Sequence, residues 1–137
     1  LALRMDRICT NTIKVAEYLK KHAKVEWVNY AGLPDHADHG LVQKYMGGRA
    51  SGILSFGVKG GFEAGGRFQD ALKLITRLVN IGDAKSLACH PASTTHRQLS
   101  PAELAKAGVS PDMVRLSIGI EHIDDIIADL EQALAAV

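Results

Sequence analysis

Apolar and polar residues alternate from Met113 to Glu121, and this period of two is typical of a β-strand with one buried face. The opposite face carries Arg115. A strand holds such a guanidinium in a fixed position, where it can bind a carboxylate or phosphate through two parallel hydrogen bonds. The pattern leaves two interpretations open: Arg115 binds an anionic ligand, or it pairs with a surface acid such as Glu121.

The residues that follow this strand have helical spacing. Apolar side chains recur every three or four positions over residues 123–134, which predicts an amphipathic helix that extends to about residue 136. Glu121, Asp124 and Asp125 stand near its start, where the positive end of the helix dipole favours acids. The strand of Arg115 is therefore expected to lie between the core and a C-terminal helix.

The same patterns predict three further strands and four further helices. The strands are expected at residues 25–30, 53–58 and 85–89, and the helices at about 4–22, 38–46, 67–78 and 100–108. Ser100-Pro101-Ala102-Glu103 forms a capping box, and Asp38 is expected to cap the helix 38–46. Four strands with intervening helices predict the α/β class, as an α+β two-layer sandwich with helices on one face of the sheet.

Three loop segments are candidates for chemistry. The paired glycines at 60–61 and 65–66 lack the lysine of a phosphate-binding loop and predict a loop with positive φ angles. Residues 35–39 hold histidines and aspartates, but no second ligand pair follows at metal-binding spacing, so no metal site is predicted. Residues 93–96 lack a nucleophile elbow and are expected to form a hydroxyl-rich loop that donates hydrogen bonds.

Composition adds few constraints. The chain has 137 residues, 47% hydrophobic and 23% charged, which suits one globular domain with a core. A net charge of +1 gives no electrostatic reason to expect nucleic acid or an anionic membrane as a partner. Cys9 and Cys89 make no disulfide framework, so a cytoplasmic location is expected. Because the first residue is not a methionine, we expect a piece of a longer protein.

Five short motifs run along the chain in a distinctive order. They are Tyr30-Ala31-Gly32-Leu33-Pro34; Gly52-Ile53-Leu54-Ser55-Phe56 with Lys59-Gly60-Gly61; Asn80-Ile81-Gly82-Asp83-Ala84-Lys85-Ser86-Leu87; His90-Pro91-Ala92-Ser93 with Thr95-His96; and Val114-Arg115-Leu116-Ser117-Ile118-Gly119 with Glu121. Together they resemble the C-terminal part of the Cys/Met-metabolism family of pyridoxal-phosphate enzymes. Asn80-Ile81-Gly82 and the run from Thr94 to Leu99 are most similar to its O-acetylhomoserine sulfhydrylase branch.

The resemblance implies that residues 1–137 are the small C-terminal domain of the aminotransferase-like fold, which binds the substrate carboxylate. In the family, the arginine of this strand binds the α-carboxylate, and that role falls on Arg115. The residues matching Asn80 and Thr95 line the same end of the pocket.

The resemblance also implies a cofactor, pyridoxal 5'-phosphate. None of the lysines here stands in a motif like that of the cofactor lysine, so no catalytic residue is expected in this chain. The cofactor is expected to be bound by a large domain upstream, and the fragment alone is expected to be inactive.

The implied whole enzyme is a homotetrameric transferase of methionine and cysteine biosynthesis. It would replace the acetate of O-acetyl-L-homoserine with sulfide or a thiol. Two alternatives remain: a sister activity, cystathionine γ-synthase or methionine γ-lyase, or a non-catalytic amino-acid-binding module that uses Arg115.

Overall fold

Five strands form a single mixed sheet with β5 at its centre. The structure is a computed structural model that describes all 137 residues. The strands are β1 (Val25–Asn29), β2 (Ile53–Val58), β3 (Thr76–Arg77), β4 (Leu87–Cys89) and β5 (Met113–Ser117). Their order is β1-β2-β5-β4-β3, and every neighbouring pair is antiparallel except β3 and β4, which are parallel.

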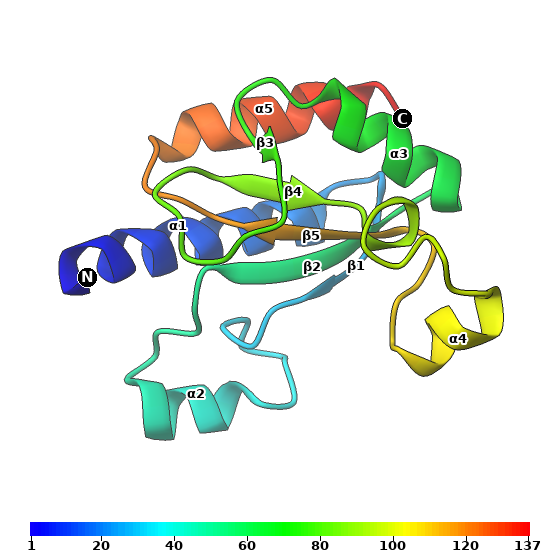
Figure 1. The fold of residues 1–137 in the computed structure, drawn as a ribbon. Coiled ribbons are helices and arrows are strands. Elements are labelled where there is room, and N and C mark those ends of the chain that lie inside the picture. Colours follow the sequence, from blue (N-terminus) through cyan, green and yellow to red (C-terminus); the bar gives the residue numbers. More distant parts are fainter.

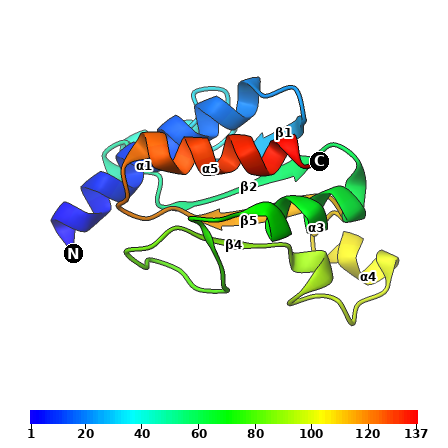
Figure 2. The same ribbon diagram turned by 90° about the horizontal axis from the view of Figure 1, so that it is seen from above.

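The helices divide into two groups. They are α1 (Ala2–Lys21), α2 (His39–Met46), α3 (Gly61–Ala71), α4 (Pro101–Lys106) and α5 (Ile123–Ala135), with a 3-10 turn at Pro91–Ser93. The helices α1, α3 and α5 form one layer against the sheet (Figures 1 and 2), whereas α2 and α4 stand apart from that layer. This arrangement confirms the predicted two-layer sandwich with helices on one face.

The core lies between the sheet and this helix layer, as strand alternation requires. Val114 and Leu116 of β5 and Leu54 and Phe56 of β2 are at most 1% exposed. The ring of Phe56 meets Phe68 of α3 edge-on, with centroids 5.4 Å apart. The residues between these positions point to the other face, which the helix layer leaves uncovered.

The predicted helix at 67–78 is wrong in both bounds. Helix α3 begins at Gly61 and ends at Ala71, and Thr76–Arg77 forms a fifth strand that the pattern did not predict. The reason is a long-range contact, because the carboxylate of Asp129 accepts the backbone N–H groups of residues 73, 74 and 75 at 2.8–2.9 Å. These donors would otherwise have continued the helix.

The glycine prediction is half correct. Gly60 and Gly61 have positive φ angles of 107° and 70°, as expected of a loop that enters a helix. Gly65 and Gly66, however, lie inside α3. Gly65 faces the fully buried His90, and a Cβ on Gly65 would stand 2.6 Å from the imidazole Nε2. The absence of a side chain therefore serves packing at Gly65.

Most other elements match the prediction within a few residues. The strand of Arg115 is shorter than expected, because β5 ends at Ser117. The capping box at Ser100 forms, with the Ser100 and Glu103 side chains each bonded to the other's backbone N–H. Asp38 occupies the N-cap position of α2 without a side-chain cap bond. None of the helices combines the length and the apolar character that a transmembrane span requires.

The triple acceptor Asp129 generates a stability prediction. Asp129→Asn would leave three backbone N–H donors facing an amide N–H₂ at a buried position, since the Asp129 residue is only 5% exposed. We expect the free energy of unfolding to fall by about 2–4 kcal/mol. Urea denaturation measures this, with Asp124→Asn in the exposed first turn of α5 as the control. Equal losses in both variants would contradict the anchoring role.

Candidate functional site

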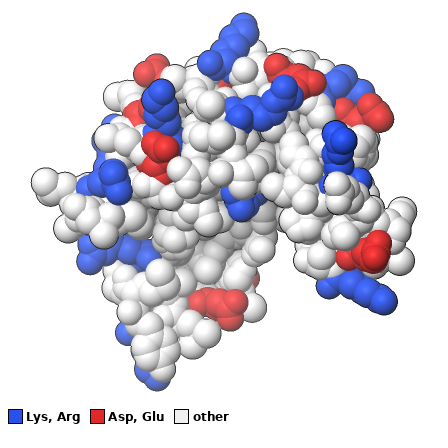
Figure 3. Space-filling model, viewed as in Figure 1, with Lys and Arg blue, Asp and Glu red and all other residues white.

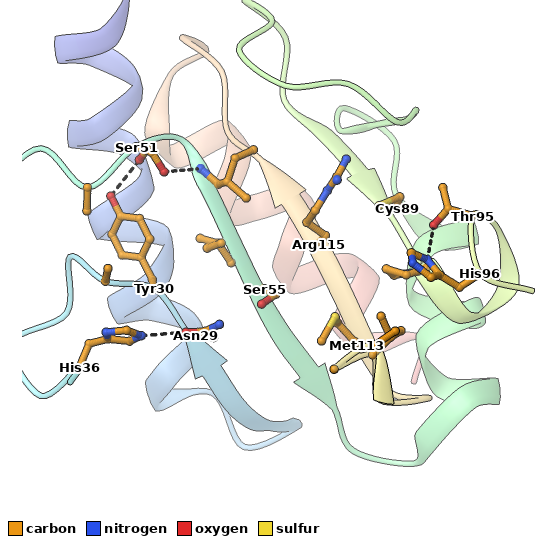
Figure 4. Close-up of a pocket in the computed structure, with 18 of the residues that line it drawn as sticks. Asn29, Tyr30, His36, Ser51, Ser55, Cys89, Thr95, His96, Met113 and Arg115 are labelled. Atoms are coloured by element: carbon orange, nitrogen blue, oxygen red, sulfur yellow. Dashed lines mark hydrogen bonds between the residues drawn. The ribbon is translucent and has the colours of Figure 1, made fainter. Parts of the chain in front are cut away.

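The uncovered face of the sheet forms the floor of a cavity of about 740 Å³. Its floor includes Ser55 of β2, Arg115 of β5 and Cys89 of β4, which the strand register places side by side. One rim is built by residues 29–51, around Tyr30 and Ser51, and the other by the loop after β4 (Figure 4). The space-filling view shows a hollow on this face between the two projecting parts of the molecule (Figure 3).

Arg115 is half-buried on this floor and has no acidic partner. No carboxylate lies within 4.0 Å of its guanidinium. The carboxylate of Glu121 instead accepts hydrogen bonds from the backbone N–H and hydroxyl of Ser86, at 2.5 and 2.9 Å. The interpretation that Arg115 pairs with Glu121 is therefore wrong. Arg115 presents its positive charge to the cavity (Figure 4). The one acidic residue of the lining, Asp38, belongs to the opposite rim and forms no ion pair with Arg115.

Cys89 is the immediate neighbour of Arg115 on the cavity floor. Both cysteines are free, as the sequence predicted, and both are buried. Burial raises the pKa of the Cys89 thiol, and the nearby charge of Arg115 and its hydrogen bond oppose that shift. At neutral pH Cys89 is therefore a neutral thiol, and the net charge of the floor is that of Arg115.

The rim loop that holds Thr95 is anchored by His90. The imidazole Nε2 lies 2.7 Å from the Pro111 carbonyl oxygen, which can only accept, so Nε2 carries the proton. Nδ1 then accepts from the Ser93 hydroxyl at 2.8 Å. The Thr95 hydroxyl is exposed at the cavity, 2.8 Å from Nδ1 of His96. Residues 93–96 thus form the polar loop that the sequence predicts.

Two of the three predicted site residues line the cavity, and the third does not. Arg115 and Thr95 line the same cavity. Asn80 is exposed in the loop between β3 and β4 and is not among the lining residues, and its side-chain oxygen accepts the Ile81 N–H at 2.8 Å. The neighbouring Val79 shares a smaller cavity with Cys89 and Thr94, so the Asn80 loop approaches the floor from the β4 side.

The opposite rim holds residues to which the sequence analysis gave no role. The hydroxyl of the buried Tyr30 donates to the Ser51 carbonyl at 2.9 Å, and burial raises the Tyr30 pKa well above its usual range. Ser51 has a φ angle of 92°, which is rare for a residue with a side chain and often found near functional sites. His36 bonds Asn29 at 2.9 Å. Only the motif 30–34 pointed to this rim.

The lining residues suit an anion but not pyridoxal phosphate. A Schiff base needs a lysine amine, and no lysine lines the cavity. The arginine, hydroxyls and buried floor can bind a carboxylate by charge-assisted hydrogen bonds. The cavity therefore has donors that a carboxylate could use and no lysine amine for covalent attachment of the cofactor.

A sequence profile of the Cys/Met metabolism PLP-dependent enzymes matches residues 1–135, and the chain belongs to this family. O-acetyl-L-homoserine sulfhydrylase 1 of Thermus thermophilus is 55% identical over 98% of this chain, and the enzyme of that name from Leptospira meyeri is 54% identical over 98%. Homocysteine synthase of Schizosaccharomyces pombe is 51% identical over 98%. The chain covers 32%, 30% and 31% of these proteins, respectively, so it spans about a third of their length.

A solved structure supports the same relationship. The chain superposes with a TM-score of 0.90 on the crystal structure of a Campylobacter jejuni protein described as an O-acetylhomoserine (thiol)-lyase, with 47% sequence identity. The superposition covers 98% of this chain and 32% of that one. That structure holds a pyridoxyl-lysine phosphate residue. The family, the fold and the use of pyridoxal phosphate by the family are thus as the sequence motifs implied.

The environment of Cys89 yields a pH prediction. A raised thiol pKa leaves less thiolate at pH 8 than a free cysteine has, so iodoacetamide should label Cys89 more slowly than free cysteine. The rate should continue to rise above the pH at which free cysteine levels off. Arg115→Ala should move the profile further up in pH, because Arg115 lowers this pKa. Peptide-resolved mass spectrometry separates Cys89 from Cys9, and an Arg115→Ala profile that moves down would contradict the assignment.

Proposed function

We propose that this chain is the C-terminal domain of a PLP-dependent O-acetyl-L-homoserine sulfhydrylase and that Arg115 binds the substrate α-carboxylate. The observation that carries the proposal is a half-buried arginine without an acidic partner on a cavity floor. The names of relatives that are more than 50% identical support the choice of this enzyme within the family. The large cofactor-binding domain would precede this one in the full-length protein.

In this proposal the chain contributes orientation and not bond making. Two parallel hydrogen bonds from the Arg115 fork fix both the position and the rotation of a carboxylate. Thr95 and Asn80 would contribute neutral donors from the loops on the β4 side. Holding the amino acid in this way presents its α-proton and its γ-carbon to the reacting groups of the large domain, which is catalysis by positioning.

The proposed reaction replaces one group on the γ-carbon. The bond from the γ-carbon to the acetate oxygen breaks, a bond to the sulfur of sulfide or a thiol forms, and the proton of the thiol is released with the acetate. Bound pyridoxal phosphate would supply the electron sink for this exchange. We place the enzyme in methionine and cysteine biosynthesis, in the cytoplasm and as a homotetramer.

The first prediction concerns Arg115 in the full-length protein. Arg115→Ala should raise the KM for O-acetyl-L-homoserine by about 30- to 700-fold, the equivalent of about 2–4 kcal/mol of charge-assisted binding. Arg115→Lys should fall between, because it keeps the charge and loses the fork. Steady-state kinetics measure this, with Arg67→Ala on the exposed side of α3 as the matched control. An unchanged KM and kcat in Arg115→Ala would remove the assignment.

Asn80→Ala and Thr95→Ala belong to the same series. Each removes one neutral donor, so the KM should rise by about 5- to 10-fold.

Product analysis of the wild-type protein with sulfide, cysteine and methionine separates the sulfhydrylase from cystathionine γ-synthase and methionine γ-lyase. Binding of amino acids without turnover in any of these assays would favour a non-catalytic module.

The second prediction concerns the isolated domain. Residues 1–137 mixed with pyridoxal phosphate and then dialysed should retain no pyridoxal absorbance, because the cavity lacks a lysine. The full-length protein, treated in parallel, should retain it. Retention by the isolated domain would show that a lysine of this chain binds the cofactor and would overturn the proposed division between the domains.

A further inference from the structure

Two of the sequence motifs meet at a point outside the cavity. One is the loop between β3 and β4, which carries Asn80, and the other is the segment that follows β5. At the left of Figure 1 these two segments lie side by side. The backbone N–H of Ile120 donates to the Ala84 carbonyl at 2.9 Å. The loop is thus attached to the continuation of the strand that carries Arg115.

Ser86 and Glu121 form the centre of this attachment, which we call the Ser86–Glu121 latch. The Glu121 carboxylate accepts the Ser86 N–H and the Ser86 hydroxyl, at 2.5 and 2.9 Å. The Ser86 hydroxyl oxygen in turn accepts the Gly119 N–H at 2.9 Å. Each polar group of the pair therefore bonds the other segment, and Ser86 is 0% exposed.

The latch is tightly packed. A Cβ on Gly119 would stand 2.3 Å from the Ala84 carbonyl oxygen and 2.5 Å from Glu121 Oε2, so the two segments meet with no room for a side chain. On the helix side, the amide of Asn11 donates to the carbonyls of Gly119 and Glu121 at 3.1 and 3.0 Å. Asn11 is 1% exposed, so a buried side chain of α1 also holds the segment.

The charge of Glu121 has no cationic partner within 4.0 Å in this chain. Its two oxygens are directed to neutral donors of a single residue, Ser86. A carboxylate used in this way fixes geometry, since hydrogen bonds to an ionised acceptor are short and directional. Residues 79–82 of the loop make no hydrogen bond to another segment, and residues 78–82 are exposed.

We propose that Glu121, acting through Ser86, is a positioning residue for the substrate carboxylate site. The latch sets the distance between the loop of Asn80 and the strand of Arg115, and both would bind one carboxylate under the proposed function on which this inference rests. A carboxylate engages donors only over a few tenths of an ångström, so a loosened loop loses its contribution to binding. Glu121 itself does not touch the substrate.

The test uses the full-length protein loaded with pyridoxal phosphate. Glu121→Ala and Ser86→Ala should each raise the KM for O-acetyl-L-homoserine by about tenfold, and the double variant should do no worse than Glu121→Ala. Glu121→Gln keeps one acceptor oxygen and should recover part of the loss. The KM for sulfide should stay within about twofold of wild type, because sulfide has no carboxylate for Arg115 and Asn80 to bind.

Asp112→Asn is the matched control. Asp112 accepts from the Trp27 indole at 2.9 Å just before β5, so the variant perturbs a carboxylate at the other end of the same strand. It should lower Tm without changing either KM. If the latch variants lower Tm in the same way and leave the KM for O-acetyl-L-homoserine unchanged, the latch is only structural and the inference is overturned. A rise of both KM values together would also overturn it.

Failure of the proposed function has a different signature. In that case wild type lacks turnover of O-acetyl-L-homoserine, or Arg115→Ala leaves its KM unchanged. Failure of the latch alone leaves wild type active and Arg115→Ala impaired, with the Glu121 variants like wild type. A further check is Asn80→Ala combined with Glu121→Ala. If Glu121 acts by placing Asn80, the combined rise in KM should fall short of the product of the two single rises.

Discussion

The structure depends on β5, which contributes one face to the core and the other face to the cavity. One face of this central strand must be apolar, because Val114 and Leu116 close the core under the helix layer. The alternation of a strand then places Arg115 on the other face, flanked by β2 and β4 through backbone hydrogen bonds. The same strand that completes the core thus fixes the backbone position of Arg115 on the cavity floor, and the proposed binding of a carboxylate depends on this placement.

The parts of the fold that the sequence predicted are those set by local pattern. Alternation located β2 and β5, helical spacing located α1 and α5, and the capping box located α4. The part around α3 and β3 could not be predicted, since it depends on partners far away in sequence. Asp129 draws residues 73–75 out of the helix, and two residues of strand at Thr76–Arg77 are too few for any periodicity.

The site shows the same division. Arg115 was predictable because a charge on the polar face of a buried strand is conspicuous. The motifs also pointed to Thr95, which lines the cavity, and to Asn80, whose role remains a prediction. Tyr30 belongs to one of the motifs, but its pattern gives it no role, and Ser51 lies outside every motif. The contribution of Tyr30 is a hydrogen bond to a carbonyl 21 positions away, and that of Ser51 is a backbone angle.

The contact between Gly65 and His90 joins the two sides of the sheet. Gly65 belongs to the helix layer, whereas His90 holds the loop that brings Thr95 to the cavity. A Cβ on Gly65 would stand only 2.6 Å from the imidazole, so helix α3 packs against His90 with no room for a side chain between them. A side chain at position 65 would therefore displace His90 and, with it, the loop that forms this rim of the cavity. In a mutational survey position 65 would group with the residues of the pocket, although it lies on the opposite side of the sheet.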